Sequence, residues 1–117
     1  LGRHKEALVA AQEAVALHRS VAGESPDTFQ KERALATAML GKCREQMGDT
    51  EGALTSVAEA ISLLSPIFLQ HPEAVVHWMD TMCRQYTERS RKLGRATDKA
   101  LLAPIIEMFA KLRQSGG

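Results

Sequence analysis

The residues of this chain best suited to metal binding or nucleophilic catalysis are its four histidines and two cysteines. They are His4, His18, His71, His77, Cys43 and Cys83. None falls into an HExxH pattern, a zinc-ligand spacing or a Ser-His-Asp type arrangement. His77 and Cys83 form one pair at an awkward spacing, which we interpret as structural. The histidines are expected near helix ends or on exposed faces.

The glycines do not form a phosphate-binding loop either. Gly41, Gly48 and Gly52 lack the Gly-rich spacing that cradles a nucleotide, and they fit helix packing and helix termination instead. We therefore expect no catalytic residue, no metal and no cofactor in this chain.

The overall charge gives no general attraction to nucleic acids or anionic membranes. Lys and Arg number 15 against 14 Asp and Glu, for a formal net charge of +1. Two cysteines without a CxxC spacing predict reduced thiols. The sequence shows no signal peptide and no apolar span of about 18 residues, so we expect a cytoplasmic protein without membrane contact. A local basic cluster is the weakest functional alternative, because Glu88 interrupts it and aromatic residues are scarce. That cluster consists of Arg84, Arg89, Arg91, Lys92 and Arg95.

An internal repeat is the strongest feature of the sequence. "LGRHKEAL" at Leu1 is echoed by "MGDTEGAL" at Met47 and more faintly by "LGRATDKAL" at Leu93. Gly2, Gly48 and Gly94 are 46 residues apart each time (48 − 2 and 94 − 48). A period of 20–50 residues indicates a solenoid in which each unit buries its apolar face against the next.

Apolar residues recur with a helical period throughout the chain, so we expect an all-α fold. The expected helices cover residues 5–22, 27–47, 51–65, 72–93 and 98–113. Gly48 and Gly94 should end the second and fourth helices, and Thr50 should be the N-cap of the third. Pro66 predicts a kink or break at about Ser65. For the fifth helix, Pro104 leaves open a kink or a later start near residue 103.

The segment "ALATAMLGKCREQMGDTEGALTSVAEAISL", residues 34–63, resembles a tetratricopeptide repeat. Leu40 and Gly41 match its first helix, Gly48 its turn, and Ala53, Leu54 and Ala60 its second helix. "LGRHKEALVAAQEAVAL" is similar to the turn and second helix of a preceding repeat. The resemblance implies one segment over residues 1–117, about two and a half repeats of an antiparallel helix-hairpin solenoid with about five helices, cut from a longer protein. The period exceeds the family's 34 residues by 12 (46 − 34), as in a long-helix variant.

In such a solenoid the first helix of each repeat lines the concave side, where a partner peptide or helix binds. Residues on one face of the helix over 72–93 align, after a shift of 46, with residues on the helix over 27–47. The predicted partner-binding groove consists of Leu35, Met39, Lys42, Gln46, Trp78, Thr81, Arg84, Gln85, Glu88 and Lys92.

Two alternatives stay open for the groove residues. Apolar residues at helical spacing more often belong to a core than to a binding site, and Trp78 could either anchor an interface or plug the turn near Pro72. The chain contains no asparagine, so it cannot form the family's clamp for a chaperone's terminal carboxylate. Its basic groove residues could still bind an acidic partner by charge pairing.

Self-association is the remaining alternative. The first helix lacks the partner helix that should cover it, so its apolar face could form a homodimer, or the segment could act as a regulatory arm of a larger multidomain protein. The residues predicted for this face are Ala7, Leu8, Ala11, Ala14 and Val15.

Overall fold

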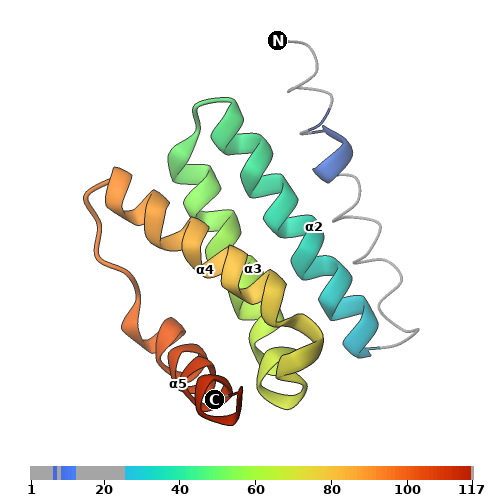
Figure 1. The fold of residues 1–117 in the computed structure, drawn as a ribbon. Coiled ribbons are helices and arrows are strands. Elements are labelled where there is room, and N and C mark those ends of the chain that lie inside the picture. The colour runs from blue at the N-terminus through green and yellow to red at the C-terminus, as the bar shows by residue number, and fades with distance from the viewer. Residues whose placement is uncertain (1–6, 8, 13–25, 117) are drawn as a thin grey trace.

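The computed structural model describes residues 7, 9–12 and 26–116 of the 117-residue chain. The described part is helical, and its four long helices are α2 (Pro26–Gln46), α3 (Thr50–Gln70), α4 (Pro72–Lys92) and α5 (Lys99–Gly116). Residues 9–12 are also helical and lie beside α2 (Figure 1). The all-α prediction is confirmed, whereas most of the expected helix over residues 5–22 lies outside the described residues.

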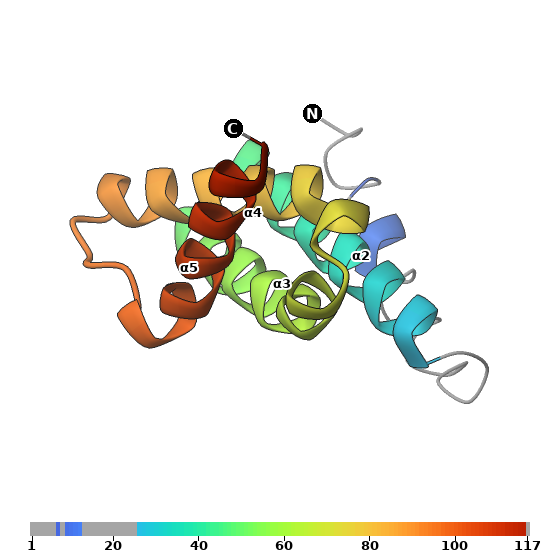
Figure 2. The same cartoon turned by 60° about the horizontal axis from the view of Figure 1, so that its bottom comes forward.

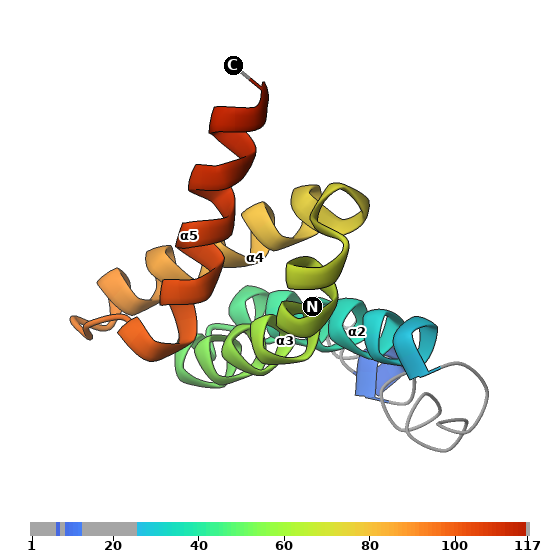
Figure 3. The ribbon, with the colours of Figure 1, turned by 90° about the horizontal axis from the view of Figure 1, so that it is seen from below.

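Helix α3 is the central element of the fold. Both α2 and α4 pack extensively against it, and α5 packs against it more lightly. A short turn after α2 returns the chain along α3, and a single residue, His71, separates α3 from α4 (Figure 1). Helix α5 crosses the direction of α3 instead of running alongside it (Figure 2, Figure 3). The structure therefore places α2 and α4 against one common helix.

The sequence repeat is also a structural repeat in α2 and α4. The two helices start and end 46 residues apart (72 − 26 and 92 − 46) and have equal lengths of 21 residues. Gly48 and Gly94 follow them with φ angles of 86° and 66°, a left-handed conformation that glycine adopts without steric cost. After each glycine, the next N–H donates 2.8 Å to the carbonyl five residues earlier. Both helices thus end in the same Schellman turn.

The N-cap of α3 corrects one prediction. Asp49, not Thr50, occupies the cap position, and its Oδ1 accepts a 2.9 Å hydrogen bond from the N–H of Gly52. A carboxylate at this position also interacts favourably with the positive end of the helix dipole. Thr50 is the first residue of the helix itself.

The break predicted before Pro66 is absent, because α3 continues through this proline to Gln70. Proline removes one backbone donor, which leaves the carbonyl of Ser62 without its usual partner. Ser62 and Pro66 are both on the exposed side of the helix, where water can reach that carbonyl. Ile67 and Phe68 follow directly and are buried, and their burial favours continuation of the helix.

Helix α5 likewise continues through its proline. It begins at Lys99 and contains Pro104 in its second turn, so the later start near residue 103 is wrong. Asp98 precedes it, and its Oδ1 accepts hydrogen bonds from the N–H groups of Ala100 at 3.0 Å and Leu101 at 3.2 Å. These bonds explain why the helix starts upstream of the proline.

The hydrophobic core lies between α3 and the other three helices. Phe68 of α3 meets Phe109 of α5 with ring centroids 5.1 Å apart, which holds α5 against the end of α3. The largest fully buried apolar side chains are Phe68, Ile61, Leu64, Met79, Ile105, Val57 and Val75. Most of them come from α3 and α4.

Helix α3 corrects the expectation that the chain has no apolar span of about 18 residues. An 18-residue window of this helix has a mean hydropathy of 1.6, enough by length and composition for a membrane span. Half of that window is buried inside the fold, where α3 packs against α2, α4 and α5. This is the environment of a central core helix.

At Gly41, α2 approaches its neighbours closely. A Cβ atom at this position would lie 3.1 Å from Cβ of Ser56, 3.2 Å from the carbonyl oxygen of Ala53 and 3.2 Å from Nη1 of Arg89. The first two contacts belong to α3 and the third to α4. The absence of a side chain at Gly41 therefore allows three helices to meet at one point.

We expect Gly41→Val to lower the free energy of unfolding by about 2 kcal/mol, because the added methyl groups force α2 away from α3. Urea denaturation followed by circular dichroism measures the change. Gln46→Val places the same side chain on an exposed site of α2 and should alter the free energy by less than about 0.5 kcal/mol. Equal stability of the two variants would contradict this role of Gly41.

Candidate functional site

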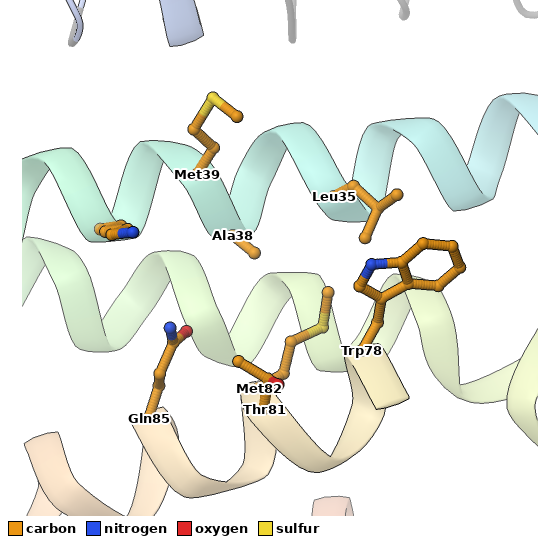
Figure 4. A pocket seen from close by; sticks show the side chains of 8 residues that line it. Leu35, Ala38, Met39, Trp78, Thr81, Met82 and Gln85 are labelled. Atoms are coloured by element: carbon orange, nitrogen blue, oxygen red, sulfur yellow. The ribbon is translucent and has the colours of Figure 1, made fainter. Parts of the chain in front are cut away.

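A surface pocket lies between α2 and α4 and has a volume of about 360 Å³. Figure 4 shows that the two helices run in the same direction along its sides, with α3 behind. The pocket is lined by Leu35, Ala38, Met39, Lys42, Trp78, Thr81, Met82 and Gln85. We call these eight residues the α2–α4 groove.

Six of the ten predicted groove residues line this pocket. They are Leu35, Met39, Lys42, Trp78, Thr81 and Gln85. Ala38 and Met82 complete the lining but are absent from the predicted set. The signal that could have identified both is their position one turn from predicted lining residues.

One end of the groove is apolar and accessible. Met39 is 60% exposed and Trp78 is 38% exposed, which is high for large apolar side chains beside a core. The ammonium of Lys31 lies 5.4 Å from the centre of the Trp78 ring, within range of a cation–π interaction. Trp78 thus lies in the groove (Figure 4), and the alternative of a plug near Pro72 is not needed to explain its position.

The other end of the groove carries polar side chains. The hydroxyl of Thr81 donates to the carbonyl of His77 at 3.1 Å, so its hydrogen is already engaged. Lys42 is exposed and Gln85 is half-buried, and neither side chain has a hydrogen-bond or ion-pair partner among the residues that the structure describes. This end of the groove therefore offers an ammonium and an amide to a ligand.

Beyond the groove, Lys92 of α4 connects directly to α2. Its Nζ lies 2.7 Å from Oε1 of Glu45. The hydrogen bond from Lys92 is the main cause that lowers the pKa of the Glu45 carboxyl below its ordinary value of 4.5, against a smaller opposing effect of burial. Lys92 is therefore engaged within the fold, and Gln46 next to Glu45 points to solvent outside the pocket.

Arg84 and Glu88 do not line the groove, although both belong to the predicted set. Arg84 pairs with Asp80, and Arg91 pairs with Glu88 at 3.0 Å. These side chains turn toward a different face of α4, around a second hollow of about 410 Å³. On an α-helix, adjacent residues are rotated by about 100°, so Arg84 points away from Gln85.

Cys83 lies in this second hollow. Burial, with a smaller contribution from the charge of Asp80, raises the pKa of its thiol to about 11. A thiol with this pKa is protonated at neutral pH and is therefore a poor nucleophile. Cys43 is buried, and both cysteines are free thiols.

The five cations of the predicted nucleic-acid surface all interact with groups of the protein. Arg89 is buried and donates a 3.2 Å hydrogen bond to the carbonyl of Ala53, and burial lowers its pKa. Arg95 pairs with Glu51. Since Arg84, Arg91 and Lys92 are also paired, this surface does not present a group of unpaired positive charges to a phosphate backbone.

The face predicted for self-association is only partly described. Ala7 is exposed, but Ala11 is only 2% exposed, so the structure covers a residue that was expected to be uncovered. The neighbouring Val9 is 51% exposed instead. Leu8, Ala14 and Val15 lie outside the described residues.

Within the described ranges, no three His, Cys, Asp or Glu side chains are arranged to hold a metal ion together. Comparison with known proteins adds no identification: no family model, no curated protein and no solved structure matches this chain. The resemblance to tetratricopeptide repeats thus remains a prediction from the residues.

The ion pair between Glu45 of α2 and Lys92 of α4 should make the free energy of unfolding depend on pH. The lowered pKa of Glu45 means that its stabilising effect is complete above the unfolded-state pKa and is lost as the pH falls through the folded-state pKa. We expect Glu45→Gln to lower the free energy of unfolding by less than about 1 kcal/mol at pH 7, because Lys92 is largely exposed. The difference from the unmodified chain should vanish in acid.

Urea denaturation at pH 7 and at a pH well below 4.5 measures this effect. Glu107→Gln, which changes an exposed carboxylate on α5, is the matched control and should give no difference at either pH. A destabilisation by Glu45→Gln that persists unchanged in acid would contradict the assignment to the ionised carboxylate.

Proposed function

We propose that this chain is a protein-interaction module that binds a peptide or helix of a partner protein in the α2–α4 groove. The observation that carries this proposal is the exposure of Met39 and Trp78 in a concave site, at 60% and 38%. Large apolar side chains that remain accessible inside a hollow gain free energy when a partner covers them.

The residue types in the groove support a macromolecular partner. Tryptophan and methionine are enriched in protein interfaces, and tryptophan is frequent among residues that contribute most to binding. The groove is open along two parallel helices and has a volume of about 360 Å³, enough for one or two side chains of a partner. A surface of this kind suits a peptide that continues beyond the pocket on both sides.

The proposal extends to the architecture of the chain. The equal lengths of α2 and α4, their identical turns and their 46-residue offset support a long-helix tetratricopeptide-like repeat. In that architecture α2 and α4 are the first helices of successive repeats, and their shared face is the concave surface. The free thiols and the use of the apolar α3 as a core helix support a cytoplasmic location.

Peptides of random sequence test this function whatever the partner is. A displayed library of 16-residue peptides, about the span of a four-turn helix, is selected on the folded chain. The affinities of the selected peptides are then measured by fluorescence anisotropy. We expect Met39→Glu to weaken binding by at least about tenfold, because it places a charge in the apolar part of the site. Circular dichroism should show that its helicity is unchanged.

Ile106→Glu provides a closely matched control for this experiment. Ile106 is 59% exposed, almost the same as Met39, but it lies on α5 outside the groove. The selected peptides should bind this variant with the affinity of the unmodified chain. Equal binding to Met39→Glu, or an equal loss with Ile106→Glu, would contradict the proposal.

A further inference from the structure

We infer that the partner segment is an amphipathic α-helix whose apolar face carries a glutamate or aspartate at one end, with the carboxylate bound between Lys42 and Gln85. This inference rests on the proposed function of the groove. It adds the chemistry and the spacing that a partner must have. The two ends of the groove are chemically different.

The polar end fits a carboxylate. The Lys42 ammonium and the Gln85 amide both line the pocket, and both lack a partner among the described residues. The neighbouring cations Arg84, Arg91 and Lys92 are already paired with carboxylates of the fold. Lys42 is therefore the groove cation whose charge is not compensated by the described part of the chain, and an acidic side chain complements it.

The apolar end fits aliphatic or aromatic side chains. Leu35, Trp78 and Met82 surround this part of the pocket, and Met39 lies one turn further along α2 with its side chain on the side away from α4 (Figure 4). Lys31 lies over the Trp78 ring and covers part of it from outside. An apolar side chain that enters here would displace water from both helices at once.

The distance between the two ends sets the spacing on the partner. Leu35 and Lys42 are seven residues apart on α2, as are Trp78 and Gln85 on α4, which corresponds to about 10 Å along a helix. A partner helix presents residues i, i+3 or i+4, and i+7 on one face over the same length. The partner helix should thus carry two apolar residues three or four positions apart and an acidic residue seven positions from the farther of them. The acidic residue can stand before or after the apolar pair.

The inference is tested on the peptides selected above, since the random library does not favour any residue type. Their alignment should show an acidic residue seven positions from an apolar one. We expect Lys42→Gln to weaken binding of these peptides by roughly tenfold, and Lys42→Arg to weaken it much less. Lys111→Gln, at an exposed lysine of α5, is the matched control and should leave the affinity unchanged.

Changes in the peptide complete the experiment. Replacing its acidic residue by the corresponding amide should cost about as much as Lys42→Gln, and the two changes together should cost little more than either one. Moving the acidic residue by two positions turns it by about 200° around the helix and should abolish its contribution. Raising the salt concentration should weaken only peptides that keep the carboxylate.

Several results would overturn the inference while leaving the proposed function intact. Peptides that lose affinity for Met39→Glu but not for Lys42→Gln would show that the groove binds without reading a carboxylate. Selected peptides with extended rather than helical spacing would exclude the helix. By contrast, concentration-dependent dimerisation that is lost in Met39→Glu would overturn both the inference and the proposed function, because a second copy of this chain would then occupy the groove.

Discussion

The structure depends on the close approach of α2, α3 and α4 at Gly41. Here the backbone of α2 lies so near to Ala53 and Ser56 of α3 that a single Cβ atom would make three tight contacts. Arg89 of α4 reaches the same point and donates to the carbonyl of Ala53. A buried guanidinium loses much of its hydration, so a backbone carbonyl as acceptor is needed to compensate. The glycine and the arginine together determine how the three helices meet.

The groove follows from this arrangement. Because α2 and α4 both pack on α3 and run in the same direction, their outer faces form two parallel walls (Figure 4). The Glu45–Lys92 ion pair connects the walls beyond one end of the groove, and Lys31 lies over Trp78 at the other. Between these contacts the side chains of α2 and α4 do not close the surface, and Met39 and Trp78 remain accessible. The packing that stabilises the fold thus also creates the candidate site.

The sequence predicted the helices and the repeat well, since helical periodicity and turn glycines are local signals. Gly48 and Gly94 end their helices as expected, and the 46-residue offset is present in the structure. The break that the sequence allowed at Pro66 does not occur, because the burial of Ile67 and Phe68 is a tertiary effect. Two predicted groove residues do not line the groove: Arg84 lies about 100° around α4 from Gln85, and Glu88 pairs with Arg91 beside the second hollow. Helical spacing gives the face of a residue but not the direction of a long charged side chain.

The fluorescence of Trp78 tests whether the α2–α4 groove is the binding surface. This residue is the one tryptophan of the chain and it lines the groove, so its fluorescence reports on this site alone. Titration with a selected peptide that lacks tryptophan should shift the emission to shorter wavelength and protect the indole from quenching by acrylamide. Binding that is detected by anisotropy, while the emission and the quenching of Trp78 stay unchanged, would contradict the account.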